Sequence, residues 1–148
     1  KEEGFKLVAH AGEEADFSYI YEALDLLDIS RIDHGVQSIK SAELMQRLKD
    51  EQMPLTVCPN SNIELRVFDN YKAHNIKELL DYGLNITINS DDPAYFKGYI
   101  NQNFINISEN LPLTEDDIIT LVKNSFRSSF ISDELKQQYL DRVDQAVG

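Results

Sequence analysis

Residues 31–58 read RIDHGVQSIKSAELMQRLKDEQMPLTVC, and this stretch decides the fold. Short apolar runs at 31–35 and 54–58 enclose a longer segment, 41–51, in which apolar residues recur three and four positions apart. Short apolar runs are typical of buried strands, and the longer periodic segment is typical of an amphipathic helix. The stretch therefore predicts a strand–helix–strand unit with two parallel strands.

The same alternation continues on both sides of this unit. Further strands are predicted at 5–10 and 84–90, and further helices at 15–27, 76–82, 114–130 and 132–143. The segments 60–75 and 93–112 are predicted to be long loops, which in such folds tend to carry binding functions. Alternating strands and helices predict an α/β fold with a parallel sheet, formed by residues 1–148 as one domain.

Composition limits the partners that the chain can bind. With 26 acidic and 14 basic residues, the formal net charge of −12 disfavours nucleic acids and anionic membranes but allows a small uncharged ligand. No apolar run approaches the roughly 18 residues of a membrane span. A single cysteine, Cys58, excludes an internal disulfide and indicates a reducing, cytoplasmic compartment.

Each predicted strand ends in a cluster of polar or reactive residues, at 10–13, 33–35, 58–62 and 90–93. The carboxyl ends of parallel strands lie on one rim, so these clusters are expected to converge. Imidazoles and carboxylates are zinc ligands, and a further Glu and His can move protons. The clusters therefore predict a metal-assisted hydrolytic site.

Each candidate residue also has a simpler structural interpretation. His10 and His34 can be strand-end histidines with backbone partners, and Glu13 can stabilise the positive end of the next helix. Two histidines at the same rim position in successive units favour the functional interpretation. His74 lies among polar neighbours before a helix and is interpreted as structural or solvent-exposed.

Asp91 and Asp92 follow an apolar run and precede Pro93. Adjacent strand residues point to opposite faces, so the two carboxylates can share a site only if the chain bends there. The alternative is an Asp turn that caps the next segment. Cys58 is interpreted as a buried strand residue, since no CxxC pair accompanies it.

Four motifs taken together resemble the second half of the adenosine and adenine deaminase family. They are HAGE at 10–13, RIDHG at 31–35, CPNSN at 58–62 and NSDDPAYF at 89–96. The resemblance implies the C-terminal half of a (β/α)8 TIM-type barrel, with the last four strands, the closing helices and the N-terminal half missing. It also implies zinc-dependent deamination of a purine, either adenine to hypoxanthine or adenosine to inosine.

The resemblance carries residue roles with it. It implies that His10 and Asp91 are metal ligands and that Glu13 protonates the purine ring nitrogen beside the attacked carbon. It implies that His34 orients or deprotonates the water that zinc activates, and that Asp92 hydrogen-bonds the purine ring. The motifs resemble the adenine-specific branch more than the nucleoside-specific one.

The sequence departs from the family pattern at three places. Lys97 stands where the adenine branch usually has a small residue, and Asn60 where it often has an apolar one. The chain has no His-x-His pair, which in the family supplies two further zinc ligands. We therefore interpret the chain as part of a longer protein, expect it to be inactive alone, and expect its open sheet edges to favour self-association.

Three other interpretations remain open. One is an amidohydrolase-type metal hydrolase with another substrate. Another is a doubly wound, receiver-like domain whose paired aspartates bind magnesium, although such domains place their acidic pair after the first strand. The third is a non-catalytic homologue used for interaction.

Overall fold

The computed structural model describes residues 3–148 as alternating strands and helices. The strands are β1 (Val8–Ala11), β2 (Arg31–His34), β3 (Leu55–Val57) and β4 (Ile86–Ile88). The α-helices are α1 (Ser18–Leu27), α2 (Ala42–Asp50), α3 (Pro59–Glu64), α4 (Ile76–Tyr82), α5 (Ile100–Asn110), α6 (Glu115–Arg127) and α7 (Asp133–Val147), and the 3-10 helices are η1 (Val36–Lys40) and η2 (Tyr71–Ala73). The predicted strand–helix alternation is confirmed, with α4 at its predicted bounds.

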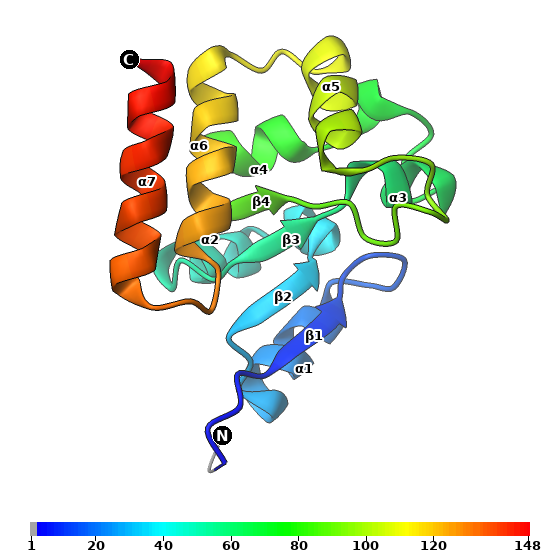
Figure 1. Ribbon diagram of the computed structural model, residues 1–148. Helices are drawn as coiled ribbons and strands as arrows, with labels where there is room; N and C mark the ends of the chain where they lie inside the picture. Colours follow the sequence, from blue (N-terminus) through cyan, green and yellow to red (C-terminus); the bar gives the residue numbers. More distant parts are fainter. Residues whose placement is uncertain (1–2) are drawn as a thin grey trace.

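The four strands form one parallel sheet in the order β1-β2-β3-β4. All four arrows point toward the side on which α3 and the loop after β1 lie (Figure 1). Sequential order is what successive βα units of a barrel produce, whereas a doubly wound sheet reverses its order at a switch point. The sheet with its flanking helices therefore has the arrangement of half a (β/α)8 barrel.

The core lies between the sheet and the helices that cover it. Ile32 on β2 and Ile86 on β4 are fully buried, as are Leu44 and Leu48, which lie four positions apart on one face of α2. Leu121 on α6, which packs beside β4, is fully buried as well. Burial of each such side chain contributes about 1.5–3 kcal/mol. This packing fixes the strand ends from which the polar clusters project.

The two predicted long loops were wrong, because both contain α-helices. α3 begins with Pro59, which suits the first helical position because it has no N–H to leave unpaired. α5 is rich in asparagine, a weak helix former, so the sequence gives little helical signal there. Tertiary packing overrides that weak propensity, since Asn103 and Ile107 on α5 are fully buried.

The remaining differences concern element ends. β1 begins at Val8 and not at Phe5, which is 72% exposed. The predicted helix starts at Thr114 and Ser132 are confirmed as N-caps, with Thr114 in a reciprocal capping box with Asp117. Within residues 3–148, no helix combines the length and apolar character that crossing a bilayer requires.

Candidate active site

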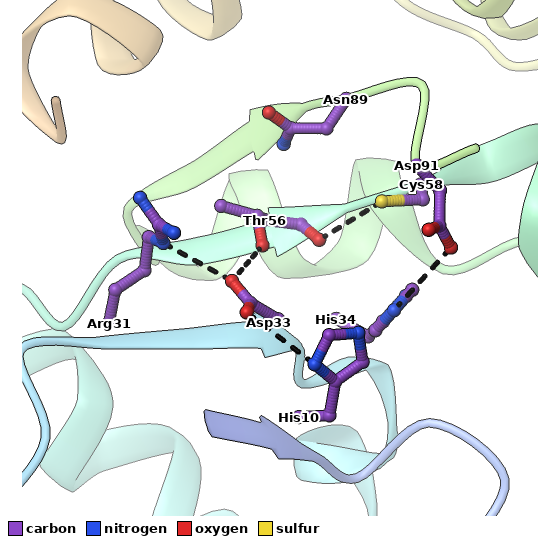
Figure 2. A pocket seen from close by; sticks show the side chains of 8 residues that line it. All are labelled: His10, Arg31, Asp33, His34, Thr56, Cys58, Asn89 and Asp91. Atoms are coloured by element: carbon purple, nitrogen blue, oxygen red, sulfur yellow. Dashed lines mark hydrogen bonds and ion pairs between the residues drawn. The ribbon is translucent and has the colours of Figure 1, made fainter. Parts of the chain in front are cut away.

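A row of polar residues crosses the sheet near the ends of its strands. The strand register pairs His10 with Asp33 and Asp33 with Thr56. Asp33 Oδ1 accepts hydrogen bonds from Thr56 Oγ1 at 2.8 Å and from Arg31 Nε at 3.2 Å, and Asp33 Oδ2 lies 3.6 Å from His10 Nδ1 (Figure 2). A carboxylate beside Nδ1 favours the proton there and leaves Nε2 free to bind a metal.

His34 ends β2 in a left-handed conformation that aims its ring toward the neighbouring strand ends. Its φ of 68° is followed by 72° at Gly35, where an added Cβ would come within 2.9 Å of Leu55. The ring is buried, with Nδ1 3.1 Å from Glu13 Oε1 and Nε2 3.8 Å from Asp91 Oδ2. Its centroid lies 5.0 Å from that of the His10 ring.

The chain bends at the paired aspartates, which is the condition for both carboxylates to share one site. Asp91 has a φ of 55° and turns its carboxylate toward His34. Asp92 is exposed, and its Oδ1 accepts from Tyr95 N at 3.3 Å, as in the Asp-turn alternative. The structure therefore brings Asp91, but not Asp92, to His34, and the substrate contact of Asp92 stays a prediction.

Glu13 reaches His34 from the loop after β1. Gly12 permits this path with a φ of 64°, since a Cβ there would meet Ile20 Cδ1 at 2.4 Å. Burial, together with the charge of Asp91, raises the pKa of the Glu13 carboxyl, while burial and the charge of His10 lower the pKa of His34. Both shifts favour the neutral form of the group concerned, and a neutral carboxyl beside a neutral imidazole pairs a proton donor with a proton acceptor.

One cavity collects residues from all four predicted clusters. It measures about 240 Å³ and is lined by His10, Arg31, Asp33, His34, Thr56, Cys58, Asn89 and Asp91 (Figure 2). His10, His34 and Asp91 therefore meet on one side of the sheet, with Glu13 joined to them through His34. Their individual roles stay predictions.

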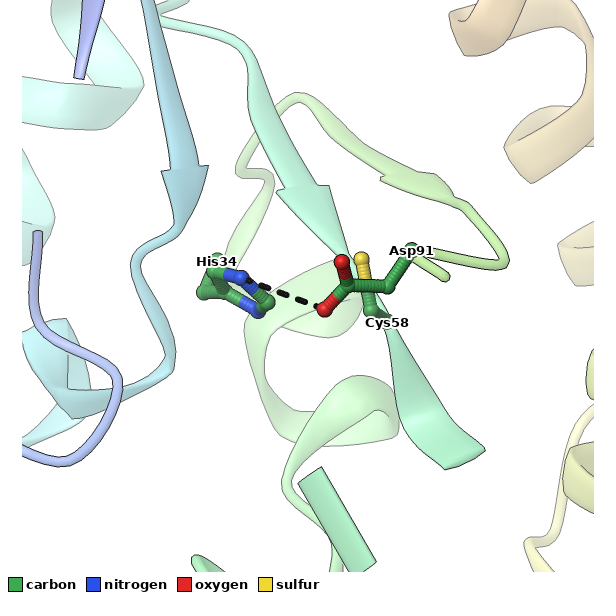
Figure 3. Close-up of side chains that lie close together, drawn as sticks. All are labelled: His34, Cys58 and Asp91. Atoms are coloured by element: carbon green, nitrogen blue, oxygen red, sulfur yellow. Dashed lines mark ion pairs between the residues drawn. The ribbon is translucent and has the colours of Figure 1, made fainter. Parts of the chain in front are cut away.

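Cys58 belongs to this site, although its sequence context indicated no chemical role. It is buried directly after β3, as predicted, and its Sγ donates to Thr56 O at 3.5 Å. Ligand atoms of His34, Cys58 and Asp91 all lie within 4.8 Å of one another (Figure 3). Burial raises the pKa of the Cys58 thiol well above its usual range, which keeps the sulfur protonated.

Asn62 and His74 also contact the site. Asn62 Nδ2 donates to Glu13 Oε1 at 2.7 Å, and His74 Nε2 lies 3.2 Å from Asn62 Oδ1. His74 is buried and not solvent-exposed, and burial lowers its pKa to about 3, so the ring is neutral. Only the position of Asn62 within the CPNSN motif indicated that it could line a pocket.

The structure accounts for the two departures from the adenine-branch pattern. Asn60 Oδ1 accepts from Tyr71 Oη and from Asn106 Nδ2, both at 2.9 Å, so an amide replaces an apolar contact with a polar one. Lys97 is exposed, and its Nζ lies 2.9 Å from Glu64 Oε2. Neither side chain lines the cavity of His10 and His34.

Sequence comparisons agree with this geometry. The chain matches the family described as adenosine deaminase over residues 1–146. An adenine deaminase of Psychrobacter cryohalolentis is 97% identical over 148 residues, which are 100% of this chain and 45% of that protein. An adenine deaminase of Hahella chejuensis is 57% identical over 96% of this chain and 42% of its own length. The chain thus spans less than half the length of these relatives.

Comparison with solved structures also matches the chain to part of longer deaminases and amidohydrolases. The crystal structure of an adenine deaminase from Arthrobacter aurescens superposes with a TM-score of 0.96 at 49% identity, over 99% of this chain and 45% of that chain. A zinc-bound amidohydrolase from Burkhoderia ambifaria superposes with a TM-score of 0.86 at 25% identity, over 98% of this chain and 43% of that chain. These partial matches confirm the predicted half barrel. Since one family covers residues 1–146, the chain belongs to the adenosine deaminase family.

Proposed function

We propose that this chain is the C-terminal part of an adenine deaminase, which converts adenine and water to hypoxanthine and ammonia. The observation that supports this most is the meeting of His10, His34 and Asp91 in one cavity, with Glu13 3.1 Å from His34. The names of the relatives from Psychrobacter and Hahella favour adenine over adenosine.

The donor atoms in the cavity fit a divalent transition metal. Imidazole nitrogen, carboxylate oxygen and a thiol lie close together there, and zinc accepts all three. We propose that His10 and Asp91 hold zinc, with further ligands from the part of full-length relatives that this chain does not span. When bound, zinc supplies Lewis-acid activation of water, lowering its pKa from about 15.7 to about 7.

We propose that Glu13 and His34 of this chain then transfer the protons of the reaction. Glu13, whose pKa is raised by burial and by the charge of Asp91, donates a proton to the ring nitrogen beside the amino-bearing carbon. The neutral His34 ring accepts a proton from the attacking water. The water oxygen bonds to the amino-bearing carbon, the proton held by His34 passes to the amino group, and the C–N bond breaks as ammonia leaves. The second proton of the water returns to Glu13 as the carbonyl forms. Asp92 is proposed to form a hydrogen bond with the purine ring of the substrate.

The test uses a chimera in which this segment replaces the matching segment of the Psychrobacter cryohalolentis protein. We expect the zinc-loaded chimera to deaminate adenine, followed by ultraviolet absorbance, with adenosine as the comparison substrate. The chain alone, which has no His-x-His pair, is expected to be inactive. A chimera that binds zinc and leaves adenine unchanged would refute the proposed function.

We also propose a cytoplasmic location and self-association of the isolated chain. The single cysteine suits a reducing compartment. Within residues 3–148, β1 pairs only with β2, so its outer edge is free, whereas the outer edge of β4 is partly occupied by Asn124 Nδ2, which donates to Ile86 O at 3.1 Å. A second copy can pair with the free edge of β1, where Val8 on the strand and Phe5 before it are exposed.

A further inference from the structure

A buried chain of polar side chains links Glu13 to the segment just before α4. His74 Nε2 lies 3.2 Å from Asn62 Oδ1, and Asn62 Nδ2 lies 2.7 Å from Glu13 Oε1. Asn62 is fully buried, and His74 is 4% exposed. Hydrogen bonds in such a buried series are strong, and a missing partner is costly. The three side chains are therefore held in one arrangement.

The surroundings of His74 decide where its proton lies. Phe68 stacks on the ring with centroids 4.2 Å apart, and His74 Nδ1 is buried without a hydrogen-bond partner among residues 3–148. A buried N–H without an acceptor is rarer in proteins than an acceptor that lacks a donor. The proton therefore lies on Nε2, which donates to Asn62 Oδ1.

This bond fixes the direction of the Asn62 amide. With Oδ1 held by His74, the NH2 group faces Glu13 Oε1, whereas a flipped amide would set two acceptor oxygens against each other. His34 Nδ1 lies 3.1 Å from the same Oε1. Within residues 3–148, the polar contacts of the Glu13 carboxyl all use Oε1, which leaves Oε2 for a substrate.

We propose that Asn62 and His74 are positioning residues, which fix the Glu13 carboxyl so that Oε2 presents its proton to the purine ring. The inference rests on the deamination proposed above. Both side chains are buried, so they are expected to act through Glu13 and not on the substrate itself. Their loss therefore reduces the rate of the chemical step more than it weakens substrate binding.

The kinetic test uses variants of the Psychrobacter chimera. Asn62→Asp replaces the NH2 donor by an oxygen, and we expect kcat to fall about 100-fold with KM changed less than about threefold. His74→Leu removes the donor to Asn62 and is expected to lower kcat about tenfold. His74→Gln places an amide NH2 near the position of Nε2 and is expected to restore most of that loss.

The control is Asn75→Asp, the same chemical change beside His74. Asn75 is buried and donates to Val36 O at 2.8 Å, and among residues 3–148 its side chain has no hydrogen bond to Asn62 or to the Glu13 carboxyl, so kcat should stay near that of the parent chimera. Equal losses in Asn75→Asp and Asn62→Asp, or in His74→Gln and His74→Leu, would mean a general structural role and overturn the proposal. An inactive parent chimera would instead reject the proposed deamination.

A second measurement does not depend on activity or on folding of a variant. Two-bond ¹H–¹⁵N correlations of the parent chimera distinguish a protonated from an unprotonated ring nitrogen. We expect the His74 proton on Nε2 at neutral pH. A proton on Nδ1 would remove the donor to Asn62 and overturn the inference, even if adenine is deaminated.

Discussion

Unusual backbone conformations coincide with the candidate active site. His34 and Asp91 are both non-glycine residues with positive φ, at 68° and 55°. Such conformations cost about 1–3 kcal/mol each and persist only where surrounding contacts enforce them. At His34 the contact is Glu13, and at Asp91 it is His34 itself. The strain turns both side chains to one cavity from different strand ends.

The identity of the metal ligands can be tested by single substitutions in the chimera. We expect His10→Asn and Asp91→Asn to lower zinc affinity by about 100-fold or more, because each removes a ligand atom. Cys58→Ser should retain zinc, since the buried thiol donates to Thr56 O and holds its proton. Zinc content after dialysis against a chelator, measured by mass spectrometry, reports all three.

The opposite pattern has a definite structural meaning. If Cys58→Ser loses zinc while His10→Asn retains it, the ligands from this chain are His34, Cys58 and Asp91, the three with donor atoms within 4.8 Å. The assignment of His10 would then be wrong.

Among the elements, α5 is attached to the site through α3. Asn103 on α5 is fully buried, and its Oδ1 accepts from Asn60 N at 3.0 Å. Its Nδ2 donates to Gly98 O and Tyr99 O at 3.3 and 3.1 Å. One side chain thus fastens the start of α3 to the segment between Asp91 and α5.

Loss of this attachment should be measurable as stability. Asn103→Leu leaves the buried Asn60 N–H without its acceptor and removes the side-chain donor to Gly98 O, so we expect the free energy of unfolding to fall by about 2 kcal/mol. Asn101→Leu, on the exposed face of α5, should change it by less than about 0.5 kcal/mol. Urea unfolding of both chimeras gives the comparison, and equal effects would show that Asn103 is not a fastening point.

On the scale of the whole molecule, two effects compete in self-association. The open edge of β1 and the exposed apolar side chains favour association, whereas a net charge of −12 repels a second copy. Figure 1 shows β1 at one margin of the sheet and α7 on the side of β4. The balance between edge pairing and repulsion depends on ionic strength, because salt screens surface charge.

This balance predicts how the isolated chain behaves in sedimentation experiments. We expect its average mass to rise with concentration and with salt, and Val8→Lys on β1 to reduce the association. Leu135→Lys, on exposed α7, is the control and should have little effect. A chain that stays monomeric at every concentration and salt level would reject self-association through the edge.

The sequence by itself determined the alternation of strands and helices, because the period of apolar residues changes between 54–58 and 41–51. It also determined which rim carries the chemistry, since polar clusters follow every strand and parallel strands end on one side. The meeting of His10, His34 and Asp91 was therefore predicted without coordinates, and the resemblance to the family supplied the proposed role of Glu13.

Tertiary structure alone decided how these residues are held. Helix α5 forms because a buried Asn103 and Ile107 outweigh weak local propensity. Asn62 meets Glu13, and His74 meets Asn62, only because the folded chain brings α3 to the loop after β1 and the segment before α4 to α3. No sequence period records a contact between residues 49 positions apart. Local pattern specifies elements and their polar ends, whereas orientation of a buried polar group depends on partners that only the packed chain assembles.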